Sequence, residues 1–215
     1  MKKISIIVPA HNEEQTIVPL LQAVRRAIEE LSIPLFEVIV IDDGSNDTTR
    51  ALLLAAPELY DDLIVLDHQH GKRGAVLKGL QRATGEFVLF QDADLEYDPR
   101  DYAALIEPVT EHGAQVVIGS RFIAPRMTRV LYFWHKMGNR LITLVSNLLN
   151  DTTFTDIYSC YLLYQRSLVP VESIRTRSWE QHGEILSLAV GKAKVLYEVP
   201  ISYRGRSYAE GKKIR

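Results

Sequence analysis

The chain of 215 residues has one cysteine, Cys160, so it cannot form an internal disulfide and offers no cysteine-based metal site. It has no run of about 20 apolar residues, which excludes a membrane-spanning helix. The apolar segment 4–8 ends at Pro9 and is too short for the hydrophobic core of a signal peptide. We therefore expect a cytoplasmic protein in which Cys160 is simply buried.

Neither sign of charge dominates, because the net charge is -2, and this gives no overall field that would attract nucleic acid. The charges are nevertheless unevenly distributed. Residues 1–100 contain 17 acidic and 10 basic side chains, whereas residues 101–215 contain 10 acidic and 15 basic ones. The segment 121–149 has five basic residues and no acidic residue. An anionic partner is therefore expected to meet the second half of the chain.

Short apolar runs alternate with helical patterns through the first 120 residues, which predicts βαβ units and a parallel sheet. The length and the 47% hydrophobic content suit one α/β domain spanning residues 1–215. Asn12 is the expected N-cap of the first helix. The expected strands are 4–8, 36–41, 63–66, 87–90, 115–118, 159–164 and 194–201. The expected helices are 13–31, one ending near 55, 72–83, 99–111, 130–149 and 179–190.

Polar residues follow three of the predicted strands. In an open α/β sheet, ligands bind outside the carboxyl ends of the strands, so these segments should face one crevice. Each segment alone is also typical of a turn or a helix start. No Gly-x-Gly-x-x-Gly follows the first strand, which disfavours a dinucleotide site and favours a nucleotide diphosphate with a divalent metal. The three segments are Pro9-Ala10-His11-Asn12-Glu13, Asp42-Asp43-Gly44-Ser45 and Asp92-Ala93-Asp94.

The third segment carries the strongest chemical signal. Asp92 and Asp94 are separated by one residue at the end of an apolar strand, with Glu96 and Asp98 beyond them. Carboxylates crowded in this way repel each other unless a cation lies between them. Hard oxygen ligands suit Mg²⁺ or Mn²⁺, which in turn suit a diphosphate. An acidic turn after a strand is the alternative interpretation.

These motifs resemble those of family 2 glycosyltransferases of the GT-A fold, and in particular the branch that transfers mannose or glucose to dolichol or polyprenyl phosphate. The resemblance covers essentially the whole chain. It implies an α/β, Rossmann-like GT-A domain with a mainly parallel central sheet and helices on both faces. It implies that residues 1–120 bind the nucleotide and that residues 121–215 bind the acceptor and end in a basic loop. The matching segments are 8–13, 42–45, 92–94, 119–121, 133–139, 203–206 and 210–214.

The resemblance also implies roles for individual residues. Asp94 is the firmest metal ligand, Glu96 a further one, and Asp92 lies closer to the nucleotide, while Asp98 caps the next helix. The residues expected to be catalytic are Asp94, Asp156 and Arg206. Those expected to bind the metal, Mg²⁺ or Mn²⁺, are Asp92, Asp94 and Glu96. Those expected to bind the nucleotide are Pro9, Ala10, Asn12, Glu13, Asp42, Asp43, Lys72, Asp92, Ala93, Arg206 and Lys212. Those expected to bind the acceptor are Arg121, Arg129 and Lys136.

The implied activity is metal-dependent, inverting transfer of a hexose from a UDP- or GDP-sugar to a polyprenyl phosphate at the cytoplasmic membrane face. The aromatic and apolar cluster 130–134, rimmed by basic residues, suits an anionic lipid surface or the polyprenyl phosphate itself. An ordinary helix with a core-facing stripe and a homodimer interface are the alternatives. A sugar or protein hydroxyl acceptor would instead require a general base, for which Asp156 and Glu184 are candidates. A non-catalytic nucleotide-sugar-binding protein is a further alternative.

The chain departs from the family pattern at three places, Gly71-Lys72-Arg73, Asp156-Ile157-Tyr158-Ser159 and His182-Gly183-Glu184. They fall where the sugar and the acceptor should bind. The resemblance therefore does not fix the sugar or the acceptor of this chain.

Overall fold

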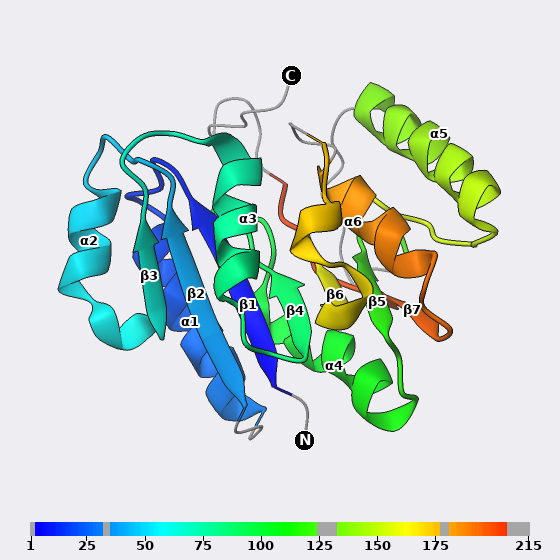
Figure 1. The fold of residues 1–215 in the computed structure, drawn as a ribbon, viewed down its shortest axis with the longest axis horizontal. Coiled ribbons are helices and arrows are strands. Elements are labelled where there is room, and N and C mark those ends of the chain that lie inside the picture. Colours follow the sequence, from blue (N-terminus) through cyan, green and yellow to red (C-terminus); the bar gives the residue numbers. More distant parts are fainter. Residues whose placement is uncertain (1–2, 32–34, 124–132, 177–180, 206–215) are drawn as a thin grey trace.

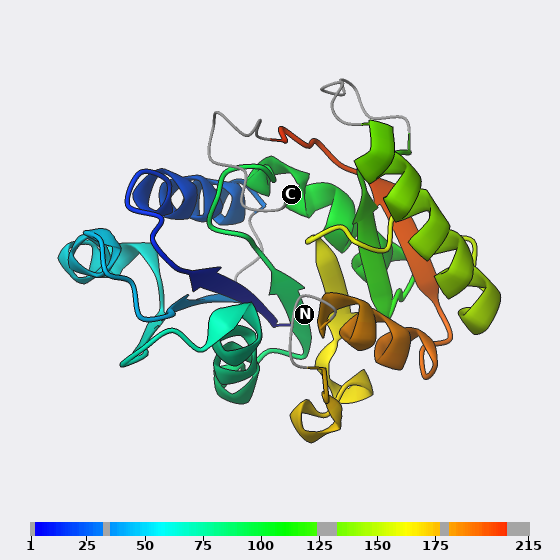
Figure 2. The same ribbon diagram turned by 90° about the horizontal axis from the view of Figure 1, so that it is seen from above.

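The computed structural model describes residues 3–31, 35–123, 133–176 and 181–205 (Figures 1 and 2). Its centre is a seven-stranded sheet in the order β3-β2-β1-β4-β6-β5-β7. The strands are β1 (Ile4–Ala10), β2 (Phe36–Asp42), β3 (Asp62–Val65), β4 (Phe87–Phe90), β5 (Val116–Ser120), β6 (Leu162–Gln165) and β7 (Leu196–Pro200).

The sheet is parallel except at β6, which runs antiparallel to both of its neighbours, β4 and β5. β1 pairs in parallel with β2 and β4, so Ala10 lies opposite Asp42 and Ile7 opposite Phe90. β1, β4 and β5 are buried almost throughout, as expected for strands that are covered on both faces. The carboxyl ends of β1, β2 and β4 therefore meet at one edge of the sheet.

Helices cover both faces of this sheet. α1 and α4 lie on one face and α3 and α6 on the other (Figure 2), while α5 lies away from the sheet and packs against α6 (Figure 1). Gly79 lets α3 approach the sheet closely, because a Cβ there would lie 2.6 Å from Ile7 Cγ2. The helices are α1 (Ile17–Glu30), α2 (Thr49–Ala55), α3 (Gly71–Arg82), α4 (Tyr102–Glu111), α5 (Phe133–Asn150) and α6 (Gln181–Val190). Short 3₁₀ turns are η1 (Pro57–Leu59), η2 (Pro99–Asp101), η3 (Arg166–Leu168) and η4 (Val171–Ser173).

The predicted α/β architecture and each predicted element are confirmed, although the sixth strand begins at Leu162 and not at 159. The first helix also begins later than expected. Asn12 is not its N-cap: α1 starts at Ile17, with Thr16 at the cap position, and Asn12 has a left-handed backbone with φ 53°. The predicted cap at Asp98 is confirmed, since its side chain accepts a hydrogen bond from Arg100 N at the start of η2. Cys160 is free and buried, as predicted. Residues 130–132 of the predicted helix 130–149 lie outside the described residues.

Among the helices in the described residues, none combines the length and hydropathy needed to cross a membrane.

Candidate functional site

The loops that follow β1 and β2 are joined to each other by side chains of the first motif. His11 Nδ1 donates to Asp43 O over 2.8 Å. The backbone N of Asn12 donates to Ser45 Oγ over 3.1 Å, and Asn12 Oδ1 accepts from Asn46 N over 2.9 Å. Asn12 is therefore used to connect the two loops, which is why it does not cap the helix.

Other nucleotide-binding candidates of the first motif also form hydrogen bonds across this junction between the loops after β1 and β2. Ala10 O accepts from Asp43 N over 2.8 Å, and Glu13 N donates to Thr49 Oγ1 over 2.8 Å. Pro9 and Ala10 are the last two residues of β1, directly before the junction. The first and second motifs therefore form one rigid surface at the edge of the sheet.

Each of the three motif loops contains one residue with a left-handed backbone. These residues are Asn12 with φ 53°, Gly44 with φ 63° and Leu95 with φ 61°. Gly44 is also required by space, because a Cβ there would lie 2.5 Å from the backbone C of His68. Glycine and asparagine adopt this conformation readily, but leucine does not, so Leu95 is strained by about 1–2 kcal/mol. Strain of this kind concentrates at functional sites.

The two aspartates of the second motif have different surroundings. Asp42 has no exposed surface, and it accepts from Arg50 Nε over 2.7 Å and from Ser45 N over 3.1 Å. Asp43 is 3% exposed and accepts from His70 N over 2.7 Å, which ties the β3–α3 loop to the same site. Both carboxylates are thus buried: Asp42 holds its own loop and Arg50, whereas Asp43 holds the β3–α3 loop.

The acidic loop after β4 is joined to α3 by an ion pair. Lys72 Nζ lies 2.5 Å from Asp92 Oδ1, with the two side chains 34% and 22% exposed. Burial alone would raise the pKa of Asp92, but the charge of Lys72 and the hydrogen bonds from Lys72 and Cys160 together outweigh it and lower this pKa. Asp94 Oδ1 accepts from Glu96 N over 3.1 Å, so the loop folds back on itself. Gln91 Nε2 donates to Asp92 O over 2.9 Å and so holds the backbone at the start of the acidic loop.

This loop has the chemistry of a site for a hard divalent cation. Asp94 and Glu96 are half-buried carboxylates on either side of the strained Leu95, and Lys72 already places a positive charge beside Asp92. The three carboxylates do not converge as closely as a complete ligand set. Within the described part of the chain, three ligand atoms lie within 4.8 Å of one another only at the exposed group of Asp67, His68 and His70.

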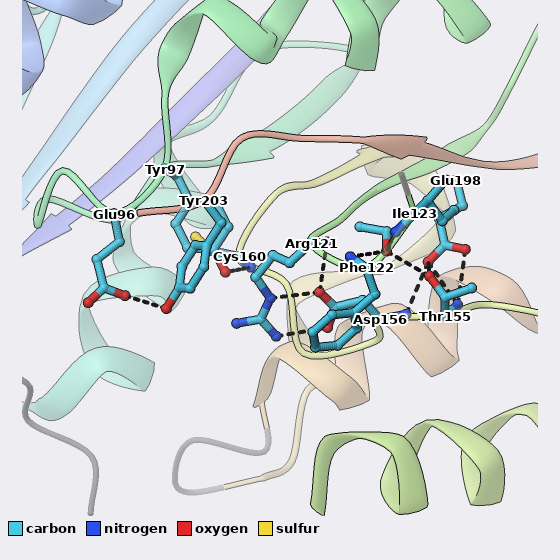
Figure 3. Close-up of polar contacts among 11 residues, drawn as sticks. Glu96, Tyr97, Arg121, Phe122, Ile123, Thr155, Asp156, Cys160, Glu198 and Tyr203 are labelled. Atoms are coloured by element: carbon cyan, nitrogen blue, oxygen red, sulfur yellow. Dashed lines mark hydrogen bonds and ion pairs between the residues drawn. The ribbon is translucent and has the colours of Figure 1, made fainter. Parts of the chain in front are cut away.

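The acceptor candidate Arg121 is fixed by the catalytic candidate Asp156 (Figure 3). Arg121 Nε and Nη2 lie 2.6 and 2.8 Å from the two carboxylate oxygens, and Arg121 N donates to the same group over 3.1 Å. Asp156 has no exposed surface, and the Arg121 side chain is 13% exposed. Burial alone would lower the pKa of Arg121, but Tyr97 and Asp156 outweigh it and raise this pKa. Asp156 therefore positions Arg121 and has no lone pair open to solvent.

Tyr203 connects this ion pair to the acidic loop (Figure 3). Its hydroxyl donates to Glu96 Oε2 over 2.6 Å, and its ring centroid lies 5.1 Å from the guanidinium carbon of Arg121. Its ring also packs on Tyr97 at 5.1 Å, and Arg204 N donates to Glu96 O over 2.9 Å. A metal candidate and an acceptor candidate that are 25 residues apart in sequence thus flank one tyrosine ring.

Sequence reasoning missed the role of Tyr203 and that of Gln91. Gln91 is fully buried, and its Oε1 accepts from Tyr102 Oη over 2.7 Å and from Tyr161 Oη over 2.8 Å. The only signal for Gln91 was a polar residue at the end of an apolar strand, directly before the acidic motif. Tyr203 follows the last strand, and its residue type alone gives no sign of a partner.

Of the remaining candidates, two are described by the structure and three are not. Lys136 is exposed on α5, with its Nζ 5.7 Å from the ring centroid of Phe122, and Arg121 lies 5.6 Å from the same ring. Glu184 accepts from the backbone N of Arg175 and Thr176 over 2.9 Å each, so it stabilises the chain before α6. Three candidates lie outside the described residues: Arg129, Arg206 and Lys212.

Solved structures with a similar fold support the predicted architecture. Glucosyl-3-phosphoglycerate synthase from Mycobacterium tuberculosis, in complex with phosphoglyceric acid, matches with a TM-score of 0.69 at 20% identity. The match covers 97% of this chain and 74% of that one. The same enzyme in complex with Mn²⁺, UDP and glucosyl-3-phosphoglycerate matches with a TM-score of 0.67 at 22% identity. The likeness shows the fold, which is the GT-A fold that the sequence predicts.

Curated relatives include undecaprenyl-phosphate 4-deoxy-4-formamido-L-arabinose transferases. That of Pectobacterium atrosepticum is 28% identical over 216 residues, covering 99% of this chain and 63% of the relative. That of Pseudomonas aeruginosa strain LESB58 is 31% identical over 214 residues, covering 97% of this chain and 60% of the relative. The chain thus spans less than two thirds of the length of these relatives. The family model "Glycosyl transferase family 2" matches residues 5–170, and the chain belongs to this family.

Proposed function

We propose that the chain transfers a glycosyl group from a nucleotide-sugar to a polyprenyl phosphate, with Mg²⁺ or Mn²⁺ bound at the acidic loop after β4. The observation that carries this proposal is the position of Tyr203, which contacts both Glu96 of the acidic loop and Arg121. A carboxylate of the donor side and a cation of the acceptor side are therefore separated only by the side chain of Tyr203. The names of the relatives support a polyprenyl phosphate acceptor.

The donor side is proposed to consist of the three interlocked motif loops within residues 1–120. Pro9, Ala10, Asn12, Glu13, Asp42, Asp43, Lys72, Asp92 and Ala93 would line or shape the nucleotide pocket, with Arg206 and Lys212 added from the basic C-terminal segment. UDP is supported by the structural neighbour that holds UDP and Mn²⁺, and GDP is the alternative base. The sequence predicts a hexose, whereas the relatives are named for an amino-sugar derivative of arabinose, a pentose. Both classes belong in the assay.

The proposed chemistry is a single displacement at the anomeric carbon. A phosphate oxygen of the acceptor forms the new bond from the face opposite the leaving group, the bond to the nucleoside diphosphate breaks, and the configuration inverts. A phosphate is already anionic, so positioning suffices and no general base is needed. A bound cation supplies positive charge that stabilises the diphosphate as it leaves. Asp94 and Glu96 would hold this cation, and Arg206 would face the diphosphate.

The acceptor side is proposed to begin at Arg121, which is positioned by Asp156, and to include Lys136 of α5, with Arg129 added from the segment that lies between them in the sequence. Arg121 is preorganised, because two of its nitrogens are fixed before any ligand arrives. Asp156 thus contributes to catalysis by holding a cation. A hydroxyl acceptor would need Asp156 or Glu184 as a free base. Both carboxylates already accept hydrogen bonds, Asp156 from Arg121 and Glu184 from the backbone of Thr176, which argues against such an acceptor.

The surface of α5 is the reverse of an ordinary amphipathic helix. The side chains that face the body of the protein are polar: Asn139, Thr143, Ser146, Asn147 and Asn150. Asn147 Nδ2, for example, donates to Phe154 O over 2.7 Å. The large apolar side chains are exposed: Phe133, Trp134, Met137, Leu141, Ile142, Leu144, Val145, Leu148 and Leu149. The interpretation as a helix with a core-facing apolar stripe is therefore wrong.

We propose that this outer face of α5 lies on the cytoplasmic surface of an anionic membrane and receives the polyprenyl chain. Lys136 and Arg140 are exposed beside the apolar side chains, and the segment 121–149 has no acidic residue. Exposed apolar surface of this extent, flanked by basic residues, suits an interfacial helix. A homodimer interface is the alternative use of the same face.

The catalytic proposal is tested by incubating the chain with labelled UDP- and GDP-sugars, Mn²⁺ and a short-chain prenyl phosphate. The panel should include hexoses and pentoses. We expect lipid-linked product that disappears without metal and in Asp94→Ala. Asp98→Asn is the matched control, because Asp98 belongs to the same acidic segment but is engaged by Arg100. Nucleotide-sugar binding without transfer to any acceptor, or transfer that survives Asp94→Ala, would overturn the proposal.

The membrane proposal is tested by flotation with vesicles that contain phosphatidylglycerol. Leu148→Glu should abolish flotation, since Leu148 is 77% exposed on α5. Leu54→Glu is the matched control, because Leu54 is 61% exposed on α2. Undiminished flotation of the Leu148 variant would contradict the proposal. A wild-type dimer in sedimentation that Leu148→Glu converts to a monomer would assign the face to a homodimer instead.

A further inference from the structure

Two buried polar atoms beside the acidic loop lack a hydrogen-bond partner. Ser159 has no exposed surface, and its Oγ has no partner among the described residues. His182 Nε2, at the start of α6, is also buried and has no partner among the described residues. Native proteins pair nearly all such atoms, because a buried polar atom without a partner destabilises the fold. Two of them at one place could pair with a group of a bound ligand.

The two atoms belong to neighbouring side chains at the carboxyl edge of the sheet. The His182 ring forms a hydrogen bond with the backbone of Ser159 and also feels the charges of Lys72 and Asp92. Its ring centroid lies 5.5 Å from that of Phe90, the last residue of β4. This position is directly beside the acidic loop, where a sugar attached to a nucleotide diphosphate would lie.

The chemistry of the two atoms favours a sugar over a phosphate. Burial and then the charge of Lys72 lower the pKa of His182 to about 4, so the ring is neutral at neutral pH. A neutral imidazole that donates one N–H to a carbonyl has a lone pair on its other nitrogen. The Ser159 hydroxyl both donates and accepts. This pair suits a ligand group with its own O–H or N–H, whereas a phosphate offers mainly acceptor oxygens.

We propose that Ser159 Oγ and His182 Nε2 form a subsite that hydrogen-bonds a hydroxyl or amide group of the sugar carried by the nucleotide diphosphate. The proposal rests on the proposed function and assigns specificity-determining residues to it. Both residues lie in segments where the chain departs from the pattern of its family, at 156–159 and 182–184. Residues that select the sugar are expected to differ between relatives that use different sugars.

The test compares binding of a nucleotide diphosphate with and without its sugar. Dissociation constants are measured calorimetrically in Mn²⁺ for UDP, GDP, UDP-glucose, UDP-galactose, UDP-xylose and GDP-mannose. The quantity of interest is the ratio of the two constants, diphosphate over diphosphate-sugar. For the best sugar, Ser159→Ala and His182→Ala should each lower this ratio about five- to tenfold, as expected for one lost hydrogen bond. Binding of the diphosphate alone should change less than about twofold.

His182→Gln should regain part of the ratio, because glutamine offers both a donor and an acceptor. It also keeps the experiment informative if the alanine variant folds poorly. His112→Ala is the matched control, since His112 is an exposed histidine stacked on Tyr197, outside this site. An unchanged ratio in Ser159→Ala, and in His182→Ala where that variant folds, would show that the two atoms do not contact the sugar and would overturn the subsite. A wild-type chain that binds no diphosphate and no diphosphate-sugar would instead overturn the proposed function itself.

Discussion

Replacing Asp156 by asparagine should destabilise the fold, because Asp156 is the only carboxylate among the described residues that forms an ion pair with Arg121. The substitution keeps the shape of the side chain and removes its charge. The guanidinium then loses the partner that faces both Nε and Nη2, at 2.6 and 2.8 Å. Since the Arg121 side chain is only 13% exposed, water cannot replace that partner fully.

The expected loss follows from the burial of the pair. Removing one partner of a buried ion pair costs about 3–5 kcal/mol, and the lower end applies here because asparagine keeps one oxygen acceptor. For a chain of this length, 1 kcal/mol corresponds to about 2–4 °C in the melting temperature, so Asp156→Asn should melt about 6–12 °C lower. Adding Arg121→Met removes the uncompensated charge, so the double variant should lose less stability than the sum of the single variants.

The assay is thermal unfolding followed by circular dichroism, alongside transfer to prenyl phosphate. Asp62→Asn is the matched control, because its ion pair with Arg82 lies at the surface, with Arg82 66% exposed. A surface pair contributes about 0–1 kcal/mol, so this variant should melt within about 4 °C of the wild type. An Asp156→Asn variant that melts like the wild type but has lost transfer would refute the positioning role. That result would favour Asp156 as a general base and a hydroxyl acceptor.

Two further predictions concern stability. Burial alone would raise the pKa of Glu37, but hydrogen bonds led by that from Lys3 lower it to about 2. Because the folded-state pKa is the lower one, the contribution of Glu37 is complete above about pH 4.5 and is lost as the pH falls toward 2. Glu37→Gln should therefore be less stable than the wild type at pH 6, with a gap in melting temperature that closes on acidification; a constant gap would contradict this. Gly79→Ala should cost about 1–3 kcal/mol in denaturant unfolding, because its Cβ would lie 2.6 Å from Ile7 Cγ2. Gly138→Ala, with nothing within 4 Å, should be neutral or stabilising, and equal effects of the two would refute the packing argument.

Much of the fold follows from local patterns in the sequence. The run Phe87–Phe90 is predicted and observed with the same bounds, because four consecutive apolar residues between turn signals suit a strand that is buried on both faces. The order of the strands does not follow from such patterns. The placement of β6 between β4 and β5, antiparallel to both, depends on contacts between residues about 80 positions apart, such as Phe87 and Gln165. A period of apolar residues carries no information about its partner.

The candidate site was predictable as a set of loops, whereas its internal contacts were not. The three strand ends follow from the sheet rule, and their acidic character follows from the sequence. The bonds from Tyr203 to Glu96 and from Arg121 to Asp156 join residues 107 and 35 positions apart, and no spacing signals them. The orientation of α5 is a different failure. Its pattern predicts two faces, but only the hydrogen bonds of side chains such as Asn147 show that the polar face turns inward.

The two ion pairs of the site differ in burial, and this difference assigns them different tasks. Lys72 and Asp92 are 34% and 22% exposed, so water and an arriving diphosphate can reach both partners. Under the proposed function, this pairing would be exchanged, with Lys72 turning to the diphosphate and Asp92 to a cation or a ribose hydroxyl. Arg121 and Asp156 are 13% and 0% exposed, and exchange there would leave a carboxylate buried without a partner. Under the proposed function, the first pair would respond to the donor, and the second would stay in place and hold the Arg121 guanidinium in a fixed position for the acceptor.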